Sequence, residues 1–349
     1  MITLLTDVIV LSLLIATALG MVVMRNVFSA AMLLGIFSLL SALFFVSLDA
    51  VDVAFTEAAI GAGMSLILML TALGLTDTGL QQRSRLQWGP LVLVSLTGLA
   101  LIYGTLDLPL LGDVTAPVHQ HVVPRYLDSY HEVGLLNLVT AVLASYRGFD
   151  TLGETFVVFT AGIAVMGLLN PDRDTRALIR ESDRPMYHHT ILVVISRLFI
   201  PLILLFALYV QFHGDFGPGG GFQAGVIFAT GLILYAMLYG TRHAERVINP
   251  TTRNVIMSGG VWLYAFTGVT AMILGGEFLN YSVFMQDAVQ GQHYGVFLVE
   301  LGVGMTVAMV MLSMFYAFSE YLLDHTQDII QDKSLSASGF SRPASEEHQ

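Results

Sequence analysis

His213-Gly-Asp-Phe-Gly-Pro-Gly-Gly-Gly-Phe-Gln-Ala-Gly225 joins two long apolar segments, at about 191–210 and 226–239. A membrane hairpin needs only a short polar turn here, and this stretch is far more elaborate. The three glycines after Pro218 can adopt backbone conformations that other residues avoid, and they leave no side chain to block a neighbouring helix or an ion. The stretch therefore predicts a helical hairpin in a membrane, with either a structural polar rim or an ion-path role. The polar groups are His213, Asp215 and Gln223, and the backbone motif comprises Gly217, Pro218, Gly219, Gly220, Gly221 and Gly225.

Composition also indicates a membrane protein. Hydrophobic residues make up 55% of the chain and charged residues 12%. Several apolar runs are long enough to cross a hydrocarbon core of about 30 Å. The absence of cysteine excludes disulfides, thiolate metal sites and cysteine nucleophiles. The net charge of -11 collects in loops and in the tail, and no basic patch supports nucleic-acid binding.

Nine apolar segments predict an all-α, polytopic fold with about nine transmembrane helices. The amphipathic segment Glu132–Arg147 is expected to lie at the surface or against the bundle, not across the membrane. With the N-terminus outside and the C-terminus cytoplasmic, nearly all arginines fall on the cytoplasmic side, as the positive-inside rule requires. The predicted spans lie near residues 5–24, 27–48, 51–75, 89–106, 150–169, 191–210, 225–240, 254–274 and 294–318.

A charged stretch divides the chain into two modules. Residues 171–189 read as a cytoplasmic linker, because arginine and aspartate are concentrated there. We expect a five-helix first module at 1–170 and a four-helix second module at 190–323. The polar tail at 324–349 is expected to be irregular beyond a helical turn or two.

Glu57 is a carboxylate within the third predicted span, where it is costly unless it is paired, protonated or in contact with water. It is an ion-path candidate, although a glutamate that reaches the outer end of its helix explains it almost as well. Gly61 and Gly63 follow it. They favour close helix packing, and they could also accommodate a π-bulge.

Glu154 and Asp150 open the fifth predicted span and are ion-path candidates. Thr151 or Asp150 can cap this helix, and Glu154 lies three residues after Thr151, as a capping box requires. The cap is the default role for this glutamate.

Glu300 lies in the last span, on a helix with small residues, and could exchange protons if it is buried. A structural hydrogen bond to a tyrosine or threonine competes with that role. Arg197 is a weaker candidate, since an arginine near a helix end commonly extends to the headgroups.

The loops at the outer ends carry further acids and histidines. The topology gathers several of them at one surface, which would favour cation capture. They are His213, Asp215, Glu277, Asp287 and His293. His119 and His121 have short spacing, but exposed loop histidines rarely bind a metal, so no metal site and no cofactor are predicted.

Two sets of motifs resemble a known family. GPGGGFQAG at 217–225 and VELGVGMTV at 299–307 resemble the B subunit (MnhB-like) of the Mrp-type cation/proton antiporters and its counterpart in membrane-bound hydrogenases. FTEAAIGAG at 55–63 and RGFDTLGE at 147–154 resemble the C-terminal region of the Mrp A subunit and the equivalent small hydrogenase proteins. The first module is also similar in layout to the J subunit of respiratory complex I.

The resemblance implies a fused membrane subunit of a Na⁺ (monovalent cation)/H⁺ antiporter complex in a bacterial or archaeal plasma (inner) membrane. Its implied partners are a large antiporter-like subunit and small three-helix subunits, and the ions transported are Na⁺ and H⁺. Lys333 is the sole lysine, so the lysine–glutamate pairs of a proton-pumping subunit are absent and the chain is not a transporter alone. Two alternatives stay open: a subunit of an ion-translocating hydrogenase or related oxidoreductase, and a purely structural scaffold.

Overall fold

The computed structural model describes residues 2–73, 88–110, 112–128, 130–169, 186 and 189–337. Within them, helices are the only regular secondary structure. Nine of these helices are long and apolar enough to cross a membrane, which confirms the predicted all-α fold with nine spans. The side of the membrane on which each terminus lies stays a prediction.

The first module contributes five spans and a series of short helices. Its third span changes from α-helix to π-helix and back, at the glycines where a π-bulge was considered. The elements are α1 (Ile2–Val23), α2 (Val27–Ser47), α3 (Val51–Thr56), η1 (Glu57–Met64), α4 (Ser65–Leu73), α5 (Trp88–Thr105), α6 (Pro117–Gln120), α7 (Val123–Asp128), α8 (Tyr130–Val133), α9 (Leu138–Thr140), η2 (Ala141–Tyr146) and α10 (Gly148–Leu168).

The second module contributes four spans. The glycine-rich stretch forms the turn between the first two of them, and residues Gly214–Gly220 are called the glycine turn below. Gly220 has a φ of 112°, which favours glycine, and α13 starts directly after it. The elements are α12 (Thr190–His213), α13 (Gly221–Tyr239), α14 (Thr241–Val247), α15 (Pro250–Ile273), η4 (Tyr281–Phe284) and α16 (Ala288–Ala337).

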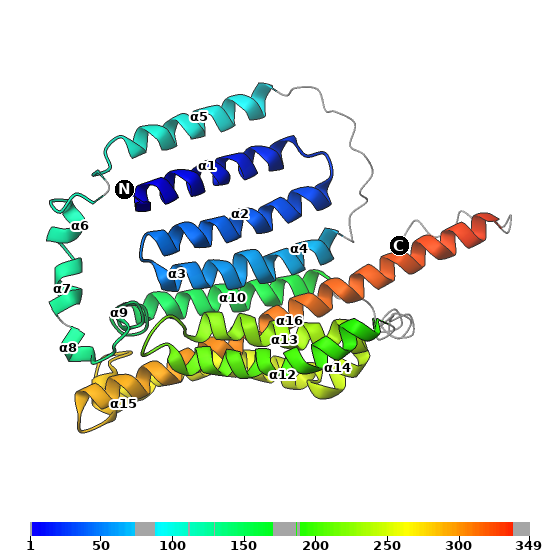
Figure 1. Ribbon diagram of the computed structural model, residues 1–349. Helices are drawn as coiled ribbons and strands as arrows, with labels where there is room; N and C mark the ends of the chain where they lie inside the picture. Colours follow the sequence, from blue (N-terminus) through cyan, green and yellow to red (C-terminus); the bar gives the residue numbers. More distant parts are fainter. Residues whose placement is uncertain are drawn as a thin grey trace.

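The helices of the first module form a row that ends against the bundle of the second module. Figure 1 shows α1, α2 and α3–α4 as a row beside the bundle, with α5 beyond α1 in this view. α10 packs against α15 and α16, and the η1–α4 helix packs against α13 and α16. The two modules therefore meet along the helices α13 and α16.

Both modules contribute to one hydrophobic core. Met64 and Leu135 of the first module belong to the same buried cluster as Ile233, Tyr264 and Val299 of the second. The boundaries between the modules stay a prediction, because this core does not divide at the linker.

Glycines allow the helices of the second module to approach closely. A Cβ on Gly302 would lie 2.6 Å from the carbonyl oxygen of Gly260, across the α15–α16 contact. A Cβ on Gly225 would lie 2.8 Å from the carbonyl oxygen of Gly304. These contacts leave no room for a larger residue, as is typical of small-residue helix interfaces in membranes.

The segment Glu132–Arg147 does not form a tenth span. It folds into α8, α9 and η2, and Leu135, Ala141 and Ala144 are buried in the core. Of the two predicted placements, the one against the bundle is confirmed.

The C-terminal helix is longer than predicted. α16 continues to Ala337, whereas we expected irregular structure beyond a turn or two after residue 324. A helix that is already nucleated extends at little cost through residues with moderate helix propensity. Most of the predicted linker at 171–189 and the last residues of the tail lie outside the described residues.

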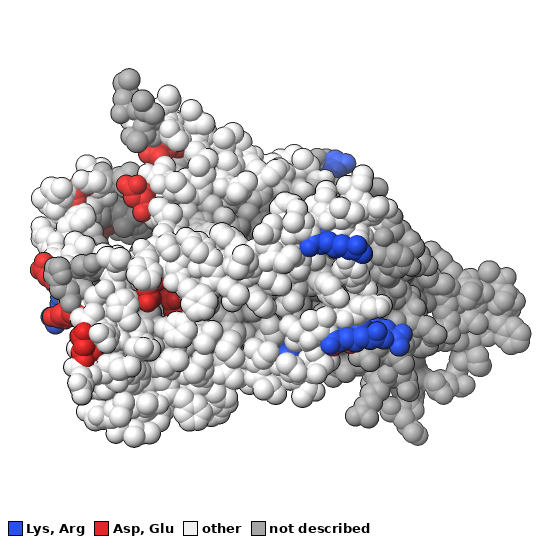
Figure 2. Space-filling model, turned by 60° about the horizontal axis from the view of Figure 1, so that its bottom comes forward, with Lys and Arg blue, Asp and Glu red and all other residues white. Residues whose placement is uncertain are grey.

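Charges separate along the molecule. In Figure 2, acidic side chains gather mainly at one end and basic side chains at the other, with surface free of both between them. This arrangement is expected of a protein that crosses a bilayer with one end facing the cytoplasm.

Candidate functional site

A cavity of about 520 Å³ lies where the two modules meet. Three carboxylates line it, Asp52 and Glu154 from the first module and Glu300 from the second. Its remaining polar lining comes from Thr56, Thr140, Thr151, Gln223 and Tyr264, and the backbone of Gly219, Gly220 and Gly221 closes one side. We call this space the central cavity.

Helix periodicity selects which acids of the third span face the cavity. Asp52 and Thr56 are four residues apart and share a helix face. Gln223 of α13 reaches across to this face, and its Nε2 donates to Oγ1 of Thr56 over 2.8 Å. Glu57 lies on another face, where its Oε1 is 2.6 Å from the position of a Cβ on Gly61, close to Ser38 of α2. The structure therefore brings Asp52, and not Glu57, to the cavity.

The glycine turn surrounds the carboxylate of Glu300. A Cβ on Gly214 would lie 2.8 Å from Oε2 of Glu300, and a Cβ on Gly220 would lie 3.1 Å from Oε1. Larger residues at these positions would fill the space that the carboxylate occupies. The elaborate glycine content is thus explained by an acid that the turn encloses.

Asn137 connects the two modules at the cavity. Its Nδ2 lies 2.9 Å from the carbonyl oxygen of Gly217 and 3.3 Å from Oδ1 of Asp52. The backbone N–H of Gly219 donates to the same Oδ1 of Asp52 over 3.2 Å. Asp52 is therefore held by one donor from each module, and the amide of Asn137 bridges the carboxylate and the turn.

Two further hydrogen bonds fix the glycine turn. Thr140 Oγ1 donates to the carbonyl oxygen of Gly214 over 2.8 Å. The backbone N–H of Asn137 donates to the carbonyl oxygen of Asp215 over 3.1 Å. The side chain of Asp215 points elsewhere, with Oδ2 3.2 Å from Nδ1 of His293 at the start of α16. Burial raises the pKa of Asp215 above the usual range for aspartate, and the hydrogen bond with His293 acts in the opposite sense.

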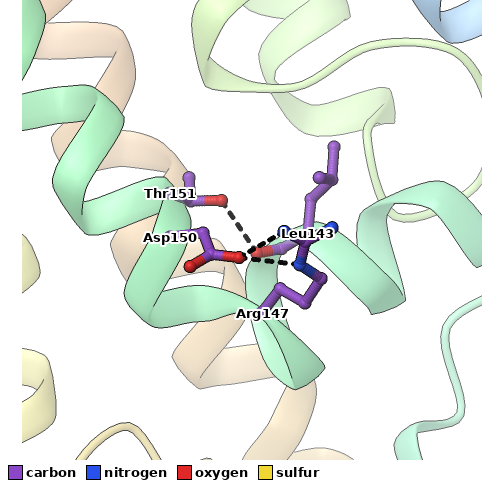
Figure 3. A network of polar contacts seen from close by, with 4 residues as sticks. All are labelled: Leu143, Arg147, Asp150 and Thr151. Atoms are coloured by element: carbon purple, nitrogen blue, oxygen red, sulfur yellow. Dashed lines mark hydrogen bonds and ion pairs between the residues drawn. The ribbon is translucent and has the colours of Figure 1, made fainter. Parts of the chain in front are cut away.

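At the junction between η2 and α10, side chains donate hydrogen bonds to backbone carbonyl oxygens. Figure 3 shows Thr151 donating to the carbonyl oxygen of Leu143, beside the ion pair between Arg147 and Asp150. From the second module, Tyr264 donates its hydroxyl proton to the carbonyl oxygen of Gly148 over 2.7 Å. Asp150 is thus held by Arg147 in a 2.6 Å ion pair near the surface and is not brought to the cavity.

The predicted capping role of Glu154 is wrong. α10 begins at Gly148, three residues before Thr151, so Thr151 lies inside the helix and cannot be its N-cap. The N-cap position is Arg147, which makes no side-chain capping hydrogen bond, and the Tyr264 hydroxyl anchors the first turn by donating to the carbonyl oxygen of Gly148. Glu154 instead points into the mouth of the central cavity and is exposed there.

Two other predicted residues lie away from the cavity. Arg197 is exposed, and its Nε donates to the hydroxyl of Tyr239 over 3.2 Å. The ring of His213 stacks on Tyr209, with 5.0 Å between ring centroids, and lines a different groove together with Pro218. Within the described part of the chain, neither residue belongs to the lining of the central cavity.

The cavity has a mostly apolar lining that includes three acidic side chains. Among the described residues that line it, none is lysine or arginine, so an acid that is ionised there can attract a cation. In the part of the chain that the structure describes, no group of three or more histidine and acidic side chains is placed to hold a metal ion.

Sequence reasoning missed Asp52, Thr56, Asn137 and Tyr264. The four-residue spacing of Asp52 and Thr56 was a signal in the sequence, because it defines a polar face on an apolar helix. Asn137 gave no comparable signal, since its partners lie 80 or more residues away in the chain.

Comparison with protein families matches one stretch in each predicted module. Residues 191–313 match a family described as a domain related to the MnhB subunit of Na⁺/H⁺ antiporter. Residues 12–78 match the MbhD family, described as the D subunit of MBH. The chain joins an MbhD-like region to an MnhB-related domain. The glycine turn and Glu300 lie in the MnhB-related domain, and Asp52 lies in the MbhD-like region.

Two curated relatives show how the match is distributed. A probable A/B subunit of a K⁺/H⁺ antiporter from Rhizobium meliloti is 30% identical over 189 residues, which are 48% of this chain and 19% of that protein. The B subunit of a Na⁺/H⁺ antiporter from Bacillus subtilis is 28% identical over 127 residues, 34% of this chain and 88% of that protein. The chain thus spans a small part of the first relative, while its MnhB-related domain corresponds to nearly all of the second.

A solved structure shares the fold over most of the chain. A chain in the Mrp complex from Dietzia sp. DQ12-45-1b superposes with a TM-score of 0.68 at 24% sequence identity. The match covers 89% of this chain and 34% of the other. The fold of most of this chain is therefore similar to that of about a third of the other chain.

Proposed function

We propose that this chain is a non-autonomous membrane subunit of a multisubunit Na⁺ (monovalent cation)/H⁺ antiporter, and that the central cavity belongs to its ion path. The observation that carries the proposal is the meeting of Asp52, Glu154 and Glu300 in one cavity at the junction of the two modules. Carboxylates at membrane depth are costly and typically mark ion or proton pathways.

The chemistry of the cavity suits exchange of a cation and a proton at the same groups. A carboxylate binds either a proton or a cation, and the described lining contains no lysine or arginine that would act as a fixed counter-ion for the acids. Thr56 and Gln223 add neutral oxygens, which suit a weakly held monovalent cation. The names of the relatives include both Na⁺ and K⁺, so the cation transported is Na⁺ or K⁺.

The chain is a transporter subunit that needs partners. It aligns with only 19% of the Rhizobium meliloti relative, and most of that protein lies outside the match. We propose that a large antiporter-like subunit and small three-helix subunits supply the rest of the path. The assembly would lie in a bacterial or archaeal plasma membrane, with the arginine-rich end in the cytoplasm, which the charge separation in Figure 2 supports.

The first test is co-purification combined with transport. The chain is purified from native membrane in mild detergent and its partners are identified by mass spectrometry; antiporter-like subunits without redox proteins are expected. In vesicles that contain the complex, Glu300→Gln should lower cation-driven proton release about 100-fold. Glu277→Gln is the matched control, because Glu277 lies in the loop before α16, outside the lining of the central cavity.

Two outcomes would contradict the proposal. If Glu300→Gln and Glu154→Gln both assembled normally and retained full antiport, the cavity would be a structural scaffold and not part of the ion path. If the chain alone, as a homo-oligomer, exchanged cations in vesicles, the requirement for partners would be refuted.

A second candidate function is a membrane subunit of a redox-driven ion pump. The match of residues 12–78 to the MbhD family favours it. Metal-cluster subunits that co-purify with the chain would establish this function in place of a dedicated antiporter.

A further inference from the structure

His293, at the start of α16, forms a pair with Asp215 of the glycine turn. Their side chains approach within 3.2 Å, with 35% of the His293 side chain and 18% of the Asp215 side chain exposed. Water reaches the imidazole more easily than the carboxylate. The pair thus has an outer member and an inner member.

Glu300 follows His293 on the same helix. His293 and Glu300 are seven residues apart on α16, so they share a helix face about two turns, or roughly 10 Å, apart along the axis. The glycine turn covers the face between them. Gly214, the neighbour of Asp215 in the chain, is the residue whose missing Cβ leaves room for Oε2 of Glu300 at 2.8 Å.

The turn keeps Asp215 in this position. Its carbonyl oxygen accepts from the N–H of Asn137, and that of the preceding Gly214 accepts from Thr140. Both donors come from the first module, so the placement of Asp215 depends on contact between the modules. Because Gly214 has no side chain, its backbone can lie close to the carboxylate of Glu300.

The groups around the pair favour proton transfer. Asp215 acts electrostatically on Glu300, and Asp52 of α3 does the same from the far side of the turn.

Asp287, which accepts from the N–H of Val289 at the start of α16, is exposed. Glu132 belongs to α8, which packs against α16. The ring of His213 is stacked on Tyr209. Burial raises the pKa of Asp215, so its proton affinity lies closer to that of an imidazole than that of an exposed aspartate does.

We propose that His293 and Asp215 form a proton port that connects one aqueous side of the membrane with Glu300. This inference rests on the proposed antiport function and adds an entry route to it. The His293 imidazolium passes its Nδ1 proton to Oδ2 of Asp215, and the imidazole regains a proton from water. The neutral Asp215 carboxyl then passes its proton to the Glu300 carboxylate, and both aspartate and histidine return to their starting states. One proton enters and one reaches Glu300 in each cycle.

The port is tested in the assembled complex by the pH profile of antiport. In vesicles, His293→Gln and Asp215→Asn should each lower the rate about tenfold at alkaline pH, where protons are scarce, and much less at acidic pH. The optimum therefore shifts to lower pH. Asp215→Glu, which keeps a carboxyl group, should retain most of the parental rate and profile. His121→Gln, in an exposed loop of the first module, is the control and should change neither.

Glu300→Gln is measured in parallel. If it abolishes antiport while His293→Gln and Asp215→Asn keep the parental rate and profile, the port is refuted and the proposed function stands. If Glu300→Gln itself has no effect, the port is refuted, and the proposed function is refuted with it if Glu154→Gln also retains full antiport. A loss caused only by misfolding would be equal at every pH, would not be rescued by Asp215→Glu, and would count against the port.

Discussion

The two modules have similar hydropathy but very different packing. In the second module, 56% of the span that contains α13 and 67% of the span that contains α16 are buried within the chain. In the first module the values run from 0% for the α5 span to 22% for the α2 span, and the α12 span of the second module, at 17%, falls within that range. Figure 1 shows the same contrast, with α5 lying at the free edge of the row.

The difference shows that hydrophobicity inserts both modules into the membrane but does not fold both in the same way. Lipid is as apolar as leucine, so helices associate through close packing and hydrogen bonds. The second module has glycines at its helix contacts, and α10 and η1 reach it through the same core. The exposed helices of the first module leave apolar faces available to lipid or to other subunits.

The largest expected effect is that of Gly260→Ala. The new Cβ would meet the carbonyl oxygen of Gly302 and the Oγ1 of Thr306, both on α16. Because these are parts of a packed helix, α15 must move away, at a cost of about 1–3 kcal/mol in the free energy of unfolding. The midpoint of thermal unfolding of the purified complex in detergent should fall.

The adjacent Gly259 provides a matched control. No described atom lies within 4 Å of a Cβ placed there, so Gly259→Ala should leave the midpoint unchanged or raise it slightly. Equal midpoints for the two variants would contradict the conclusion that this glycine contact organises the second module.

Asn137→Ala tests the contact between the modules. The change removes the donor to Asp52 and to the carbonyl oxygen of Gly217, and costs about 1–2 kcal/mol because both acceptors are partly buried. With a protease site inserted in the linker at 171–189, the cleaved halves of the variant should separate at a lower detergent concentration than those of the parent. Asn249→Ala, which removes only the N-cap of α15, should not change this concentration. If both variants behaved alike, the Asn137 contact would not contribute to the association of the modules.

Asp215→Asn should change the pH dependence of stability by a smaller amount. Burial raises the pKa of Asp215 above its ordinary value of 3.8. As the pH rises through 3.8, the unfolded state therefore loses this proton before the folded state does. The free energy of unfolding then decreases until the pH reaches the folded-state pKa. The variant lacks this loss, so its unfolding midpoint should decline less than that of the parent between about pH 4 and the folded-state pKa. Parallel curves for the two proteins would show that Asp215 has no net burial cost.

The smallest expected effect is that of Gly98→Leu in α5. No described atom lies within 4 Å of a Cβ at this position, so the free energy of unfolding of the isolated chain should change by less than about 0.5 kcal/mol. A large loss of stability in the isolated chain would show that α5 packs against the rest of the first module.

Much of the fold could be predicted from the sequence because the membrane limits the choices. Apolar length alone placed all nine spans, and the amphipathic pattern of Glu132–Arg147 excluded a tenth. The start of α10 was less accessible. Thr151 and Glu154 fit a capping box in sequence, but the helix starts at Gly148 without a side-chain cap, which no local pattern indicates.

The site was predictable in its second-module half. Glu300, Gln223 and the glycine turn were identified as candidates, and the structure places them together at the cavity. The choice between Asp52 and Glu57 required the position of α13, because both acids lie on the same span and only its rotation decides which one faces Gln223. Asn137 depends on contacts between distant segments, which no local pattern encodes.

The 50 residues of α16 form one uninterrupted helix, about 75 Å long at 1.5 Å per residue. A hydrocarbon core of about 30 Å encloses less than half of that length. The C-terminal end of α16 therefore projects far into the aqueous phase as a rod that is continuous with the segment bearing Glu300. A helix transmits axial displacement with little compression. A protein that binds the projecting end would therefore be coupled mechanically to the position of Glu300.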